Sequence, residues 1–145
     1  MAHISAVVAT TDQEFRTQVG RLLRAHGIAM ADERHLGAGT APDLALADIR
    51  GGAASVQWAL ERLRTQWPAT TIVAIAGTSD PDQILMAMRA GANEFMAWPA
   101  FADETMLQDA FRTAVSRATE RVRSTRGDKR TGRTLSFFGA KGGPG

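Results

Sequence analysis

The 145-residue sequence contains no cysteine, and this absence excludes both a disulfide framework and a zinc site with Cys ligands. No apolar run approaches the ~20 residues that a membrane-spanning helix needs. The first residues, MAHISAVVATTD, also lack the basic region and the longer apolar region of a secretory signal peptide. We therefore expect a cytoplasmic protein with no membrane span.

The charged residues are divided unevenly along the chain. Residues 1–120 hold ten Lys and Arg against fourteen Asp and Glu, whereas residues 121–145 hold seven against one. A basic segment of this kind can bind nucleic acid or anionic lipid, and it is also typical of a solvated linker. We favour the linker, because residues 124–133 (STRGDKRTGR) include no apolar residue and are expected to lack regular structure.

Five short apolar runs alternate with segments in which apolar residues recur at helical spacing. The runs, each expected to form a strand, are His3–Thr10, Ile28–Met30, Asp43–Asp48, Thr71–Ala76 and Glu94–Trp98. This alternation predicts right-handed crossovers and a doubly wound α/β fold, in which helices cover both faces of a five-stranded parallel sheet. The stretch GAGTAP leaves little room for the second helix, which should be short or irregular.

Local signals mark where two of the helices begin. Thr11 with Glu14 three residues later fits a capping box at the start of the first helix, and Gly27 fits the end of that helix. Asp80 followed by Pro81 fits an N-cap with proline at the first helical position.

Three segments of the chain stand out: PDLALADIR (residues 42–50), GANEF (residues 91–95) and the step Trp98-Pro99. Together with the order and spacing of the five predicted strands, they resemble the receiver domains of two-component signalling over residues 3–120. The first segment looks like the one that ends in the phospho-accepting aspartate, and Trp98-Pro99 stands where receivers carry Lys-Pro. The resemblance implies a single flavodoxin-like domain with strand order 2-1-3-4-5 and a cis peptide bond between Trp98 and Pro99.

Receiver chemistry uses four elements, and the resemblance implies that three are absent here. Asp48 matches the aspartate that attacks phosphorus. The pair of acids that holds Mg²⁺ falls on Ala9-Thr10. The Thr or Ser falls on Ala76, or on Gly77 with a slip of one residue, and the Lys falls on Trp98. We therefore expect no catalytic residue, no metal site and no cofactor in this domain. Asp48 would then be a vestigial acceptor that caps backbone NH groups, with Trp98 packed into the vacated space.

The C-terminal residues FFGAKGGPG follow a predicted strand and resemble the deviant Walker A motif of the ParA/MinD ATPases. In such a P-loop, glycines let backbone NH groups surround phosphates at a helix N-terminus, and Lys141 matches the signature lysine. The resemblance implies that the full-length protein binds ATP and Mg through Gly139, Lys141, Gly142, Gly143 and Gly145. This fragment stops before the motif's last positions, so it should not bind ATP, and residues 134–145 should not join the first domain's sheet.

A receiver-like domain (1–120), a basic linker (121–133) and the truncated start of a ParA/MinD-like ATPase (134–145) follow the domain order of the TadZ/CpaE family of Tad/Flp pilus assembly. The resemblance implies a cytoplasmic protein at the cell pole or inner membrane. Its receiver-like half would be a non-phosphorylated, non-enzymatic module for localisation and protein contacts. The partners would be pilus proteins or a second copy of the chain, and we expect no nucleic acid.

Two alternatives to this function stay open. One is a working response-regulator receiver that is phosphorylated at Asp48. The other is part of a DNA-partitioning ATPase, in which the basic linker contacts phosphates and binding is strongly salt dependent.

The methionines indicate which surface makes protein contacts. Four of the six methionines lie between residues 86 and 106, a region that forms the dimer face of receivers. We expect Met88 to be core, because it shares a helical face with Ile84 and Leu85, and we expect Met86 to be partly exposed. Adaptable side chains at a surface are typical of binding faces. The predicted interaction face comprises Met86, Arg89, Met96 and Met106.

Overall fold

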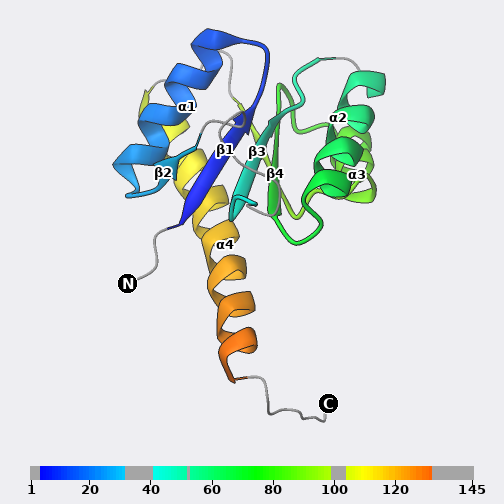
Figure 1. Ribbon diagram of the computed structural model, residues 1–145. Helices are drawn as coiled ribbons and strands as arrows, with labels where there is room; N and C mark the ends of the chain where they lie inside the picture. Colours follow the sequence, from blue (N-terminus) through cyan, green and yellow to red (C-terminus); the bar gives the residue numbers. More distant parts are fainter. Residues whose placement is uncertain (1–3, 32–40, 52, 99–103, 132–145) are drawn as a thin grey trace.

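The computed structural model describes residues 4–31, 41–51, 53–98 and 104–131. Within these ranges strands and helices alternate along the chain (Figure 1). The strands are β1 (Ser5–Ala9), β2 (Ala29–Met30), β3 (Leu44–Asp48), β4 (Thr71–Ala76) and β5 (Glu94–Ala97). The helices are α1 (Gln13–Ala25), α2 (Ala53–Gln66), α3 (Pro81–Arg89) and α4 (Glu104–Thr131).

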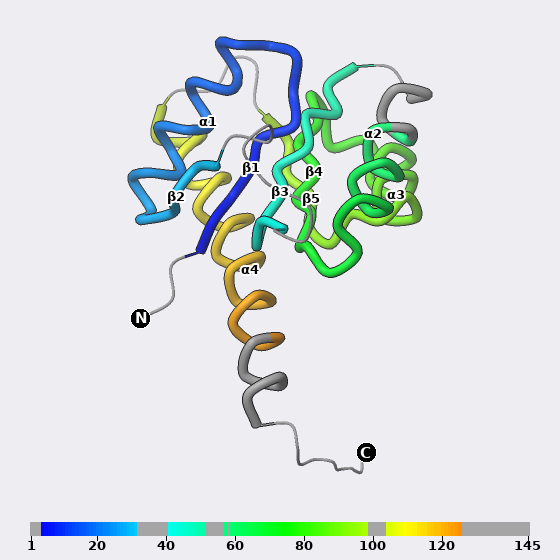
Figure 2. Tube along the Cα trace, viewed as in Figure 1, coloured from blue at the N-terminus to red at the C-terminus, as the bar shows by residue number. Residues whose placement is uncertain are grey.

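The strands form one parallel sheet in the order β2-β1-β3-β4-β5, which confirms the predicted fold class and strand order. Strands β2 and β5 lie at its two edges (Figure 2). Every residue of β4 is buried, and so are four of the five residues of β3. Because both faces of these strands are covered, their sequences are apolar runs without alternation.

Two helices pack on each face of the sheet (Figure 1). Successive strand residues point to opposite faces, so the core is divided into two clusters. Leu46 lies in the cluster that contains Phe15 of α1 and Phe111 of α4. Its neighbour Ala47 lies in the cluster that contains Trp67, just after α2, on the face that α2 and α3 cover.

The N-cap of α1 is one residue later than the sequence predicts. The carboxylate of Asp12, not the hydroxyl of Thr11, accepts hydrogen bonds from the backbone NH groups of Glu14 (3.0 Å) and Phe15 (3.2 Å). A carboxylate at this position satisfies first-turn NH groups and also complements the positive end of the helix dipole. The cap of α3 is Asp80, as predicted.

Helix α4 is longer than the sequence predicts. It continues to Thr131, so the expectation that residues 124–133 lack regular structure is wrong for 124–131. The buried stripe ends at Val122, but Arg and Lys are good helix formers, and a helix nucleated by packing extends at little cost. The apolar pattern therefore marks where α4 stops contacting the sheet, and its last turns extend beyond the sheet (Figure 1).

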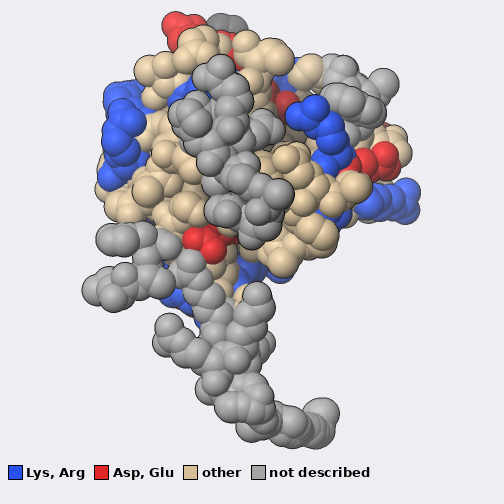
Figure 3. Space-filling view, viewed as in Figure 1, with Lys and Arg blue, Asp and Glu red and all other residues tan. Residues whose placement is uncertain are grey.

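Among the residues that the structure describes, two ion pairs connect α4 to the rest of the domain. Arg121 donates to Glu94 of β5 at 2.6 Å, and Arg21 of α1 lies 3.6 Å from Glu104. On the face shown in Figure 3, Lys and Arg side chains and Asp and Glu side chains are both present and are scattered among uncharged residues. Both arginines are more than half exposed, and ion pairs that water can reach contribute little to stability. Helix α4 is therefore held mainly by its apolar stripe.

Three predictions fall outside the described residues. They concern the short second helix, the peptide bond between Trp98 and Pro99, and the placement of residues 134–145.

Candidate functional site

The carboxyl ends of the strands bring the receiver-like positions to one edge of the sheet. Asp48 is the last residue of β3 and Ala9 is the last residue of β1, and parallel strands end at the same edge. Ala76, at the end of β4, pairs with Ala97 of β5, and Trp98 follows directly. The positions that the resemblance singles out thus share one edge, which is where doubly wound folds place their ligand sites.

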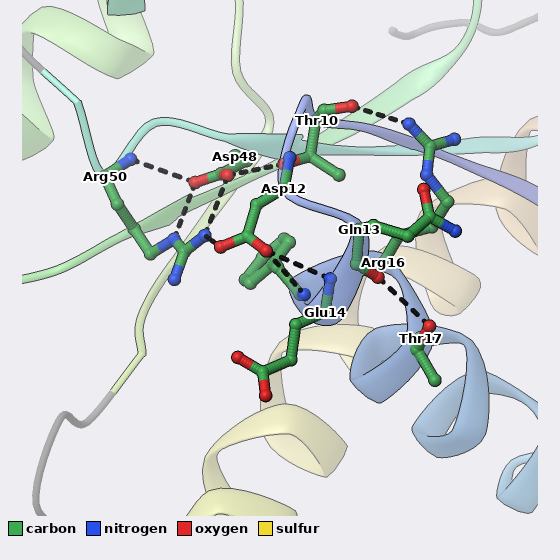
Figure 4. A network of polar contacts seen from close by, with 9 residues as sticks. Thr10, Asp12, Gln13, Glu14, Arg16, Thr17, Asp48 and Arg50 are labelled. Carbon is green, nitrogen blue, oxygen red and sulfur yellow. Dashed lines mark hydrogen bonds and ion pairs between the residues drawn. The ribbon is translucent and has the colours of Figure 1, made fainter.

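Both carboxylate oxygens of Asp48 are engaged by hydrogen bonds (Figure 4). Arg50 donates from Nε to Oδ1 at 2.8 Å and from Nη2 to Oδ2 at 3.0 Å. The hydroxyl of Thr10 donates to Oδ2 at 2.6 Å, and the backbone NH of Arg50 donates to Oδ1 at 3.2 Å. The side chain of Asp48 is only 13% exposed, so these groups take the place of water. The expected capping of a backbone NH group is one of these contacts.

The guanidinium of Arg50 also reaches a second carboxylate. Its Nη2 lies 3.0 Å from Oδ2 of Asp12, the residue that caps α1. One cation therefore bridges the end of β3 and the start of α1, and Figure 4 shows Arg50 facing both acids.

Thr10 completes the connection between β1 and α1. Its hydroxyl accepts a hydrogen bond from the backbone NH of Asp12 at 3.0 Å while donating to Asp48. Arg16 of α1 donates from Nη2 to the backbone oxygen of Thr10 at 2.5 Å. Thr10 thus acts as a hydrogen-bond donor to Asp48 and as an acceptor for Asp12, the residue that caps α1.

Two aromatic rings, those of Phe15 and Trp98, lie between Arg50 and the rest of the core. The Cζ atom of Arg50 lies 4.1 Å from the centroid of the Phe15 ring, within the range of a cation–π contact. The ring of Phe15 packs against Trp98 with centroids 4.8 Å apart and planes inclined by 59°, an edge-to-face type of arrangement. Trp98 is half-buried against the core on the side of α1 and α4. This agrees with the expectation that Trp98 is a packing residue.

The cluster consists of ionised groups. Burial opposes ionisation of Asp48, but the hydrogen bonds from Arg50 and Thr10 outweigh it and lower the pKa of Asp48 below 3.8. The pKa of Asp12 is lowered by the backbone NH of Phe15 and then by Arg50. The pKa of Arg50 is raised, chiefly by Asp48. Two carboxylates thus share one guanidinium at neutral pH.

Mg²⁺, which the receiver fold implies, does not fit these residues. Mg²⁺ requires several oxygen ligands in octahedral geometry, whereas Ala9 and Thr10 supply no carboxylate. The guanidinium of Arg50 already contacts both Asp12 and Asp48. Among the described residues, no group of three or more His, Cys, Asp or Glu side chains is placed to hold a metal ion.

Sequence reasoning missed Arg50. The residue stands two positions after Asp48 in the segment that carried the resemblance to receivers. The spacing could have indicated the contact, because the side chain of a residue two positions after an acid at a strand end can reach that acid. The contact of Arg50 with Asp12 depends on how β1 and β3 pair in the sheet, which no local signal near either residue reveals.

The chain is similar in structure to several known proteins. No protein-family model matches the chain, and no curated protein matches it. A solved structure from Burkholderia pseudomallei, described as pilus assembly-related, is 22% identical over 81% of this chain and 90% of its own, with a TM-score of 0.65. A second, described as the pilus assembly protein CpaE of Burkholderia thailandensis, is 23% identical over 81% of this chain and 98% of its own, with a TM-score of 0.64. A response regulator from Thermotoga maritima is 19% identical over 82% and 99%, with a TM-score of 0.61.

The chain has the receiver fold. At these identities the likeness shows the fold, and the solved structures that share it include pilus assembly proteins as well as response regulators. The described part of this receiver domain contains no helix long and apolar enough to cross a membrane.

The predicted interaction face needs two corrections. Met96 is 5% exposed and belongs to the core, because it lies on the side of β5 that α4 covers. Leu85 and Met88, which we expected in the core, are 49% and 40% exposed, since α3 turns the small residue Ala87 toward the sheet. Met86 is half-buried, while Arg89 is exposed and Met106 is 59% exposed.

The predicted nucleotide-binding residues lie outside the described residues. They are Gly139, Lys141, Gly142, Gly143 and Gly145.

Proposed function

We propose that this receiver domain is a protein-interaction and localisation module of a Tad/Flp pilus assembly ATPase, and that Asp48 is not phosphorylated. The observation that carries the proposal is the saturation of the Asp48 carboxylate by Arg50 and Thr10. An attacking oxygen must be free to approach phosphorus, and the charge that develops on the phosphoryl group must be balanced. Here both oxygens of the acceptor are already bonded, and Ala76 and Trp98 offer no donor side chain comparable to Thr and Lys.

The pilus role is supported by two independent likenesses. The receiver fold is shared with two proteins described as pilus assembly proteins. The segment FFGAKGGPG resembles the P-loop of the ParA/MinD ATPases. We infer that the receiver domain, which would lack a phosphorylation switch, recruits pilus proteins to the pole or inner membrane, and that the ATPase follows it in the chain.

Labelling with acetyl phosphate and Mg²⁺ tests the loss of phosphorylation. The wild-type chain and the variant Asp48→Asn are incubated in parallel, with a working receiver as positive control, and intact masses are compared. We expect no phosphoryl adduct on the wild-type chain under conditions that label the control. An adduct on the wild-type chain that is absent from Asp48→Asn would contradict the proposal and favour a working receiver.

Localisation tests the pilus role. The full-length protein and a form lacking residues 1–120 are each fused to a fluorescent protein in cells that assemble the pilus. We expect a polar or membrane focus that is lost when the receiver domain is removed. A focus that persists without residues 1–120 would place the targeting information in another part of the protein.

A further inference from the structure

Arg50 places a permanent positive charge at the carboxyl end of β3. This charge faces Asp48, the last residue of the strand, and belongs to a side chain only two residues further along the chain. Arg50 contacts Asp48 at 2.8 Å and Asp12 at 3.0 Å, and its side chain is 30% exposed. An internal guanidinium needs neither a free ion nor a phosphoryl group to hold the two acids together.

We propose that Arg50 is a built-in replacement for the divalent cation, and that it also positions Phe15 and Trp98. The planar guanidinium makes a two-pronged contact with Asp48 while its face covers the Phe15 ring. Phe15 is 1% exposed and contacts Trp98 directly. Arg50 contacts Phe15, and Phe15 contacts Trp98. The position of Trp98 at the end of β5 therefore depends on the guanidinium at the end of β3.

In this arrangement Asp12, Asp48 and Arg50 form an ion cluster at the strand ends that needs no bound metal ion. Removal of the guanidinium leaves the carboxylates of Asp12 and Asp48 without the counter-charge that they share. We therefore expect millimolar Mg²⁺ to bind near these two acids in Arg50→Ala, where Arg50 no longer occupies them. The same removal uncovers one face of Phe15 and changes the surroundings of Trp98. This role of Arg50 rests in part on the proposed loss of phosphorylation, which the acetyl phosphate experiment tests separately.

The test uses ¹⁹F NMR of the whole chain labelled with 5-fluorotryptophan, with Trp98→Phe used to assign the Trp98 signal. The main variant is Arg50→Ala, and Arg112→Ala is the matched control, because Arg112 pairs with Asp109 on the exposed side of α4. Melting temperatures are recorded with and without millimolar Mg²⁺. Arg50→Ala should shift the Trp98 signal, and Mg²⁺ should raise its melting temperature while leaving wild type unchanged.

Two milder variants cover the case in which Arg50→Ala does not fold. Arg50→Lys keeps the charge but cannot make the two-pronged contact or lie flat on Phe15. Asp12→Asn keeps the N-cap, since Asn caps as well as Asp, but removes one of the two acids paired with Arg50. Each should move the Trp98 signal in the same direction as Arg50→Ala, by a smaller amount.

Two results would overturn the assignment. If Trp98 gives the same signal in the Arg50 and Asp12 variants as in Arg112→Ala, the guanidinium does not position the aromatic rings. If Mg²⁺ stabilises wild type as much as it stabilises Arg50→Ala, or stabilises neither when Arg50→Ala is folded, Arg50 does not stand in place of the cation.

Discussion

Arg64 of α2 donates from Nη2 to the backbone oxygen of Gly91 at 2.6 Å, and so joins α2 to the turn between α3 and β5. The same guanidinium donates to the backbone oxygens of Pro68 and Thr70 and to Oδ1 of Asn93. Burial lowers the pKa of Arg64 from its usual range. Its four acceptor oxygens each take a hydrogen bond from the charged guanidinium. The side chain thus supplies donors to backbone oxygens that the helix and strand ends leave unpaired.

Gly91→Ala should destabilise the domain by about 1–3 kcal/mol. Gly91 has a φ of 121°, and a Cβ atom added there would lie 3.3 Å from Cβ and Nε of Arg64. Both the backbone conformation and the contact with Arg64 therefore oppose a side chain. The matched control is Gly77→Ala, because Gly77 has no atom within 4 Å of an added Cβ and no positive φ, and its effect should stay within about 0.5 kcal/mol. Urea unfolding measures both, and equal effects would show that Gly91 is not required.

The fold could be predicted because several local signals agree with it. The runs that became β3 and β4 are apolar throughout, since both faces of the sheet are covered. Asp80 and Gly27 mark helix ends through backbone chemistry that does not depend on the rest of the chain. The end of α4 was misplaced because apolar periodicity reports packing, and the last turns of this helix do not pack on the sheet.

The candidate site could be predicted only in part. The resemblance to receivers singled out Asp48, Ala9-Thr10, Ala76 and Trp98, and the structure places them at one edge of the sheet. Arg50 depends on a side-chain direction that periodicity does not encode. The exposure of Leu85 and Met88 was missed because a short helix with a small buried residue can turn its larger apolar residues outward.

Acid should destabilise the domain through Asp48. Its pKa is lower in the folded protein than the ordinary value of 3.8, so the unfolded chain binds a proton first as the pH falls. The contribution of Asp48 to stability is therefore fully present above about pH 3.8 and is lost as the pH drops through the folded pKa. Denaturant unfolding measured down to that range should show the loss in wild type.

The variant Asp48→Asn should remove this part of the pH dependence, because Asn does not titrate. Asp109→Asn is the matched control, since Asp109 is exposed and pairs with Arg112 across one turn of the surface of α4. It should keep the wild-type dependence. If Asp48→Asn and wild type lose stability in parallel, the Asp48–Arg50 pair does not contribute to the acid sensitivity.

Because Met96 is buried, we expect protein contacts to involve the exposed apolar residues Leu85 and Met88 of α3 instead, and replacing both by Glu should abolish such a contact. The two side chains lie one turn apart on α3 and are 49% and 40% exposed, and charges at an apolar contact must lose water without gaining a partner. Because both are exposed, the free energy of unfolding should change by no more than about 0.5 kcal/mol per residue. Light scattering of the purified protein measures contact with a second copy of the chain. Localisation of the full-length fusion measures contact with another pilus protein.

The matched control for this pair places two Glu residues on α4, at Thr113 and Ser116, which are also exposed but have small polar side chains. This control should leave both mass and localisation as in wild type. A lower mass in the α3 variant alone identifies a second copy as the occupant of the face, and lost localisation with unchanged mass identifies another protein. If the α3 variant keeps both the wild-type mass and the wild-type localisation, the exposed residues of α3 are not a binding face, and protein contacts must be sought elsewhere on the domain.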